Sequence, residues 1–143
     1  MINWTNLTEQ VTPNFTVKDC LWLAHWGRLA NENDGLDYDI QSSIVATCML
    51  AEKIRTILNC PMIVTSLYRP PSYSPLVGGT AQDVHTKGIA IDFTTLPRME
   101  IEDAKDIIRP FLTPLNIRME ANTTDWIHLD SAPVGPSGRE FNP

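Results

Sequence analysis

The stretch AQDVHTKGIAIDF, residues 81–93, decides the fold because it sets a histidine, a glycine and an aspartate in an otherwise apolar run. Its second half alternates in the manner of a half-buried strand. Asp92 stands in the middle of that predicted strand, where an unpartnered carboxylate would be costly. We therefore expect Asp92 to be satisfied either by a structural partner or by a metal ion.

Strand geometry predicts where this carboxylate points, because alternate side chains of a strand share a face. Residues 88–95 would direct one face to the core and the opposite face, which carries Asp92, to a site. The predicted core face holds Ile89, Ile91 and Phe93.

The same alternation in DWIHLD, residues 125–130, sets His128 on the face opposite the apolar side chains. If the two strands are neighbours, Asp92 and His128 lie side by side, and His85 can reach the same point from the preceding loop. Two imidazoles and one carboxylate form the three-ligand set of a catalytic zinc site, with a fourth position open to water. We predict a Zn²⁺ site made by His85, Asp92 and His128.

Asp125 precedes His128 by three residues, so strict alternation would direct it away from the site. At the strand entry, however, the hairpin loop frees its direction, and its carboxylate could act as a general base toward a water molecule on the metal. Glu120 is a nearby rival for this role. Asp130 shares the face of His128, either as a partner of that histidine or as a solvated strand end.

The remaining pattern predicts two N-terminal helices followed by strands. Thr16 to Asp19 has the form of a capping box and opens a helix to about residue 30, on which Trp22 and Trp26 are spaced for packing. The other expected elements are a helix at 39–59, a strand at 62–69, a loop at 70–82, a helix at 100–112 and a hairpin that pairs 115–120 with 125–130.

We expect an α+β fold in which N-terminal helices pack on a small antiparallel sheet that carries the metal site. The chain of 143 residues is predicted to be a single domain, 1–143, with a core over about 14–130 and an irregular tail over 131–143. A monomer is the expected oligomeric state.

Composition excludes some classes of partner. The net charge is -6 and no Lys or Arg stands beside another, which argues against nucleic acid. No apolar stretch is long enough for membrane insertion, and the N-terminus lacks the pattern of a signal peptide. Cys20 and Cys48 fall in helical patterns and are expected to be buried, reduced thiols. These features predict synthesis in the cytoplasm without a signal peptide.

Several motifs in order resemble one known family. HTKGIAID at 85–92 and DWIHLD at 125–130 are similar to the metal motifs of the M15 zinc peptidases, which have the hedgehog/DD-peptidase fold. The segments at 14–24, 64–79 and 117–130 resemble the family's opening helix, its strand with an arginine and a Gly-Gly loop, and its closing hairpin. The resemblance covers roughly residues 14–130 and is closest to the small, single-domain branch common in phages.

This resemblance implies a zinc metallopeptidase that hydrolyses peptidoglycan stem peptides, as a D-Ala-D-Ala carboxypeptidase or an endopeptidase. It implies that His85, Asp92 and His128 are the zinc ligands, that Asp125 is the catalytic base, and that Arg69 steadies the developing oxyanion. It also suggests a phage lysis enzyme released through a holin, or a virion-associated enzyme that opens the cell wall.

Asp83 departs from the family pattern, which usually has serine two residues before the first histidine. A carboxylate there could repel the C-terminal carboxylate of a substrate, or it could orient His85 as a hydrogen-bond acceptor. Two other functions remain open at this stage. One is a catalytically inactive, zinc-stabilised binding or structural module, and the other is a metal-free core with a buried salt bridge.

Overall fold

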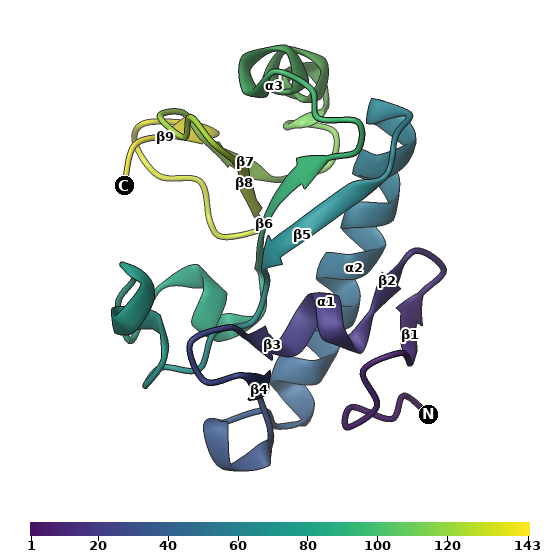
Figure 1. The fold of residues 1–143 in the computed structure, drawn as a ribbon. Coiled ribbons are helices and arrows are strands. Elements are labelled where there is room, and N and C mark those ends of the chain that lie inside the picture. Colours follow the sequence, from purple (N-terminus) through teal and green to yellow (C-terminus); the bar gives the residue numbers. More distant parts are fainter.

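A computed structural model describes all residues from 1 to 143, and its centre is a five-stranded sheet. The strands lie in the order β5-β6-β8-β7-β9 (Figure 1). Their bounds are Met62–Ser66 for β5, Ala90–Thr95 for β6, Arg118–Glu120 for β7, Ile127–Asp130 for β8 and Glu140–Phe141 for β9. Neighbouring strands are antiparallel, except that β9 runs parallel to β7.

The long helix α2, Tyr38–Leu58, runs behind this sheet and packs on it through one apolar face (Figure 1). Asp37 caps its first turn, and Asn59 ends it in the left-handed conformation just before Pro61. The shorter helix α3, Ile101–Ile108, lies at one end of the sheet and continues into a 3-10 turn, Arg109–Phe111. Both helices agree with the sequence prediction to within a few residues.

The first predicted helix is wrong beyond its opening turn. The capping box of Thr16 and Asp19 is present, but α1 covers only Val17–Leu21. The chain then forms a small hairpin between β3, Trp22–Leu23, and β4, Arg28–Leu29, which turns at Gly27 with a φ of 63°. Glycine adopts that conformation without steric cost, so the hairpin is available where the apolar spacing alone favoured a helix.

The N-terminal region is completed by β1, Gln10–Thr12, which pairs with β2, Phe15–Thr16, and by a 3-10 turn at Glu32–Asp34. The correction to α1 also separates Trp22 from Trp26, which do not share a helix. Trp26 packs edge-on against Tyr73 with ring centroids 4.9 Å apart, whereas Trp22 remains 41% exposed.

The C-terminal tail is not wholly irregular, contrary to expectation. Glu140 and Phe141 form β9 beside β7, so the sheet is not purely antiparallel. A strand of two residues has no periodicity that could be detected in a sequence. The predicted hairpin is confirmed, with Arg118 opposite Asp130 and Met119 opposite Leu129.

The architecture is therefore mixed α and β and compatible with the predicted α+β class. Cys20 and Cys48 are both buried and form no disulfide, as expected. None of the helices combines the length and the apolar character needed to cross a bilayer.

Candidate metal centre

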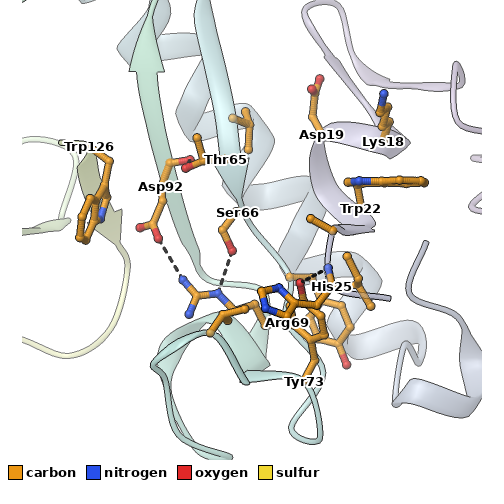
Figure 2. A pocket seen from close by; sticks show the side chains of 15 residues that line it. Lys18, Asp19, Trp22, His25, Thr65, Ser66, Arg69, Tyr73, Asp92 and Trp126 are labelled. Carbon is orange, nitrogen blue, oxygen red and sulfur yellow. Dashed lines mark hydrogen bonds and ion pairs between the residues drawn. The ribbon is translucent and has the colours of Figure 1, made fainter. Parts of the chain in front are cut away.

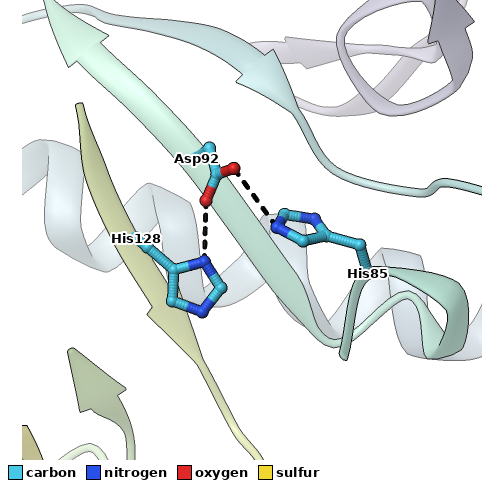
Figure 3. A group of neighbouring side chains, drawn as sticks. All are labelled: His85, Asp92 and His128. Carbon is cyan, nitrogen blue, oxygen red and sulfur yellow. Dashed lines mark hydrogen bonds and ion pairs between the residues drawn. The ribbon is translucent and has the colours of Figure 1, made fainter. Parts of the chain in front are cut away.

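Three side chains predicted to bind a metal meet at one point between β6, β8 and the loop before β6 (Figure 3). Asp92 lies between the two imidazoles, with His128 Nδ1 2.7 Å from its Oδ1 and His85 Nε2 3.2 Å from its Oδ2. One donor atom from each residue falls within 4.8 Å of the others, and all three residues are buried. The structure therefore brings together the three residues that the sequence predicts as metal ligands.

The pairing of β6 with β8 places two of these residues next to each other. Asp92 on β6 is directly opposite His128 on β8, so their side chains leave the same face. The adjacent Ile91 and Phe93 enter the core on the other face, at 1% and 0% exposure. The alternation read from the sequence is confirmed.

His85 arrives from a 3-10 turn, Val84–Lys87, that ends at Gly88 with a φ of 71°. A Cβ at Gly88 would lie 3.0 Å from Ile44 Cγ1 and 3.2 Å from the Ile40 carbonyl oxygen of α2. Only glycine therefore lets the chain turn this closely against the helix between His85 and Asp92.

The outer ring nitrogen of each histidine has a partner of its own. His85 Nδ1 lies 2.8 Å from the Leu67 carbonyl oxygen, and His128 Nε2 lies 2.8 Å from Asp130 Oδ2. These contacts fix each ring so that the other nitrogen faces the cluster, which is the usual support of a metal-binding histidine. Two nitrogens and one carboxylate oxygen suit Zn²⁺, so the residues present fit the predicted metal.

The electrostatics of the cluster favour a positive charge at its centre. Burial alone would raise the pKa of Asp92, but hydrogen bonds from His128 and His85 outweigh it and hold that pKa well below its usual range. Burial opposes the charged form of His128, yet its contacts with Asp130 and Asp92 raise its pKa to about 9. The carboxylates thus hold a proton on His128, and a bound cation would take the place of that proton.

Arg69 lies beside the cluster, as the family resemblance implied (Figure 2). Its Nη2 donates to Asp92 Oδ2 at 3.0 Å, and its Nε donates to Ser66 Oγ at 2.8 Å. Nη1 makes no hydrogen bond within the protein. A guanidinium held at two points with a free donor suits the stabilisation of a developing negative charge.

The cluster lies where two hollows meet, and Arg69, Asp92 and Trp126 line both. The first hollow, about 520 Å³, extends toward Trp22 and His25 of the N-terminal region (Figure 2). The second, about 730 Å³, contains all three candidate ligands and is bounded by the loop at 77–84 and the C-terminal tail. We refer to these two adjoining hollows together as the cleft, and the candidate metal centre lies in its second hollow.

Asp125 is not brought to the cluster. It is exposed in the loop between β7 and β8, and it lines neither hollow. Its only hydrogen bond runs from Arg98 Nη2 to its backbone oxygen at 3.2 Å. Trp126 beside it does line the cleft, and Glu120, the rival carboxylate, lines the second hollow.

Asp83 fastens the loop that carries His85. Its carboxylate accepts hydrogen bonds from Ser74 Oγ, from the Thr80 amide at 3.0 Å and from the His85 amide at 2.8 Å. Burial alone would raise its pKa, but the contacts with Ser74 and Thr80 lower it. The side chain therefore positions the backbone of His85, and it does not contact the imidazole ring.

The sequence analysis did not identify two residues that support His128. Arg118 donates to both oxygens of Asp130, at 2.7 and 2.9 Å, and Phe141 packs on the Arg118 guanidinium. The register of the predicted hairpin places residue 118 opposite residue 130, so Arg118 could have been identified from the sequence. No feature of the sequence indicated a role for Phe141, because the two-residue strand β9 could not be predicted.

Comparison with known proteins agrees with this geometry. The family model described as Peptidase M15 matches residues 24–130, which are most of the chain and include every candidate ligand. No curated protein and no solved structure matches significantly. The residues after 130, among them β9, lie outside the matched range. On the strength of this match, the chain belongs to the peptidase M15 family.

Proposed function

We propose that the protein is a zinc-dependent metallopeptidase that hydrolyses stem-peptide bonds of peptidoglycan. One observation carries the proposal: a buried His85–Asp92–His128 cluster, with both outer ring nitrogens held, lies on the floor of a cleft in a chain of the M15 family. Three protein donors that leave one position open are typical of catalytic zinc.

A zinc ion bound there would polarise the scissile carbonyl and acidify a water molecule. The side chains of this chain supply the remaining chemistry. Arg69 would direct its free Nη1 donor at the oxygen that gains negative charge. Asp125 would take the proton of the attacking water and deliver it to the leaving amine. The Asp125 role rests on the spacing of the D-x-x-H motif.

The cleft suits an extended peptide. Its first hollow is lined by apolar and aromatic side chains together with a few charged groups, which is the usual composition of a site that orients a polar ligand, and its second hollow is mostly polar. The second hollow holds all three candidate ligands and the first adjoins it at Asp92, so the two together leave room for several residues of a substrate. We propose that the enzyme acts as a monomer on the cell wall, after release through a holin or from a virion.

The first test is digestion of purified peptidoglycan by zinc-loaded protein, with the fragments identified by mass. We expect new termini within the stem peptide. Asp125→Asn should lower turnover by about 10²–10⁴-fold while one zinc stays bound. Asp103→Asn, at an exposed position of α3 that lines neither hollow, is the matched control and should retain activity. Equal turnover in wild type and Asp125→Asn would remove Asp125 from the mechanism.

The exposed position of Asp125 favours one alternative, a zinc-stabilised binding module that has lost catalysis. That alternative predicts zinc binding and no new termini in wild-type digests. The metal-free alternative is favoured by the ion pairs that Asp92 makes with Arg69 and the two histidines. It predicts no zinc in elemental analysis of the purified protein.

A further inference from the structure

A third hollow lies next to the catalytic cleft, on its N-terminal side. Its volume is about 860 Å³, and it is bounded by residues 2–7 and 28–33. Trp22 lines both this hollow and the first hollow of the cleft. The exposed Trp22 therefore borders both hollows.

The lining of this hollow has the chemistry of a saccharide site. Two indoles line it: Trp4 is half-buried against the core, and the exposed Trp22 has the Lys18 ammonium 5.5 Å from its ring centroid. The C–H face of a pyranose ring can stack on the face of Trp22 that Lys18 does not occupy. The side chains of Glu32, Asn33 and Gln41 also line it, and none of them makes a hydrogen bond within the protein. Amides and carboxylates of this kind are free to bind hydroxyl and acetamido groups.

The charges of the hollow argue against a polyanion as the ligand. Arg28 is its only cationic side chain, and its guanidinium is paired with Asp34 through contacts of 2.6 and 3.0 Å. Glu32 adds an unpaired negative charge. A neutral, hydroxyl-rich ligand fits this balance better than a phosphate or a nucleic acid.

We propose that this hollow binds the N-acetylated glycan strand of peptidoglycan. The inference rests on the proposed function, because a stem peptide in the cleft is covalently attached to that glycan. An extended residue spans at most about 3.6 Å, so three stem residues keep the sugar within about 11 Å of the scissile bond. The glycan must therefore lie at one end of the peptide cleft, and the first hollow leads from Asp92 to Trp22 at this end.

The test uses the tetrasaccharide of N-acetylglucosamine as the probe and indole fluorescence as the readout, so no hydrolysis is required. Wild-type protein should bind it saturably. Asn33→Ala combined with Gln41→Ala should weaken binding about tenfold, since two hydrogen bonds are lost. Gln10→Ala, an amide that lines no part of the hollow, is the matched control. Intact peptidoglycan should be cleaved more slowly by the double variant, whereas free stem peptide should be cleaved at the wild-type rate.

Absence of saturable binding, or equal affinity in the double variant, would overturn the glycan site. Either result would leave the peptidase proposal intact, because that proposal is judged on hydrolysis of free stem peptide. Failure of hydrolysis with normal tetrasaccharide binding would instead overturn the proposed function and keep the saccharide site.

A second inference rests on a different observation, the contacts of Phe141 on the C-terminal strand β9. The Phe141 ring lies 4.0 Å from the Arg118 guanidinium carbon and 5.9 Å, edge-on, from the His128 ring. Arg118 holds both oxygens of Asp130, which is wholly buried and contacts His128 Nε2 at 2.8 Å. The contacts run without a break from β9 to a candidate zinc ligand.

Each contact in this series of side chains depends on the next one. A buried carboxylate such as Asp130 needs a cation, and Arg118 supplies it with a two-point contact. Stacking on Phe141 keeps the guanidinium in place. The strand itself is tied down by the Ala121 amide, which donates to the Phe141 carbonyl at 2.7 Å, and by an ion pair between Glu140 and Arg109.

We infer that Arg118 and Phe141 are positioning residues that keep His128 Nδ1 turned toward the metal. The segment after residue 130 would then be part of the metal centre, although it lies outside the range matched by the family model. The readout is zinc affinity, measured by competition with a chromophoric chelator. Phe141→Ala should weaken it by about 10–100-fold, the usual effect of losing support around a ligand.

Phe111→Ala is the matched control, because Phe111 is 39% exposed and lies on the 3-10 turn after α3. Circular dichroism would confirm that both variants fold. Wild-type zinc affinity in folded Phe141→Ala would overturn the positioning role. Failure of the wild-type protein to bind zinc would overturn the metal centre itself, so the two failures are distinguishable.

Discussion

Asp92 shows how one residue links fold and chemistry. It occupies a strand position whose neighbours enter the core, yet its own side chain accepts contacts from His85, His128 and Arg69. A carboxylate buried in this way is stable only because each oxygen has a charged or polar partner. Its alternation with Ile91 and Phe93 was visible in the sequence, which is why the candidate ligands could be predicted before the structure was known.

Tyr68 makes a second buried polar contact. The raised pKa of its phenol predicts that the free energy of unfolding depends on pH. Burial, reinforced by the charges of Asp34 and Asp37, raises its pKa to about 12. Its phenol donates to the Asp34 carbonyl oxygen at 2.9 Å. Because the folded pKa lies above the unfolded one, this contribution is intact below about pH 10 and is lost as the pH rises through 12.

The test is urea unfolding at pH 8 and pH 11 for wild type and Tyr68→Phe. The variant should be less stable by about 1 kcal/mol at pH 8, since it lacks the hydrogen bond. It should also lose less stability than wild type between the two pH values. An equal loss in both proteins would show that Tyr68 does not contribute.

Lys105 supports the loop that carries Asp125. Its side chain is only 1% exposed, and its ammonium donates to the carbonyl oxygens of Ala121 at 2.9 Å and Thr123 at 2.7 Å. Lys105→Met would leave those carbonyls without a partner and should lower the free energy of unfolding by about 2 kcal/mol. Lys53→Met, at an exposed position of α2, is the control in chemical denaturation and should change stability by less than about 0.5 kcal/mol.

At the scale of elements, the sequence was most informative where packing has a clear period. The β6 and β8 alternation and the long apolar face of α2 are repeated over enough residues to be recognised. The end of α1 was not predictable, because a capping box marks where a helix starts, and tertiary contacts decided where this one stops. The two-residue β9 is defined only by its pairing with β7.

Alanine substitution should affect stability very differently at Gly79, in the loop before His85, and at Gly135, near the C-terminus. A Cβ at Gly79 would clash with Asp83 Oδ2 and Ser74 Oγ, so Gly79→Ala must displace the carboxylate whose other oxygen, Oδ1, accepts from the His85 amide. We expect a loss of about 1–3 kcal/mol in unfolding free energy. Weaker zinc binding should accompany that loss.

Gly135→Ala is the matched substitution, because a Cβ at Gly135 would meet no atom within 4 Å. It should change stability by less than about 0.5 kcal/mol and leave zinc affinity unaltered. Thermal melts and chelator competition on both variants provide the measurement. Equal effects at the two positions would contradict the proposed role of Asp83 in fixing this loop.

At the scale of the whole molecule, the candidate metal centre brings together three parts of the chain. His85 comes from the loop after β5, Asp92 from the middle of the sheet, and His128 from a strand that the C-terminal segment supports. A ligand that binds only the folded state stabilises it by mass action. Zinc should therefore raise the melting temperature above that of the metal-free protein.

The most direct test is peptidoglycan hydrolysis by metal-stripped protein titrated with zinc, with the release of new amino groups as the readout. We predict no hydrolysis without metal, a linear rise with added zinc and a plateau at one zinc per chain. Asp92→Asn should stay inactive throughout the titration. Full activity in the stripped protein, or wild-type activity in Asp92→Asn, would contradict a zinc peptidase centred on His85, Asp92 and His128.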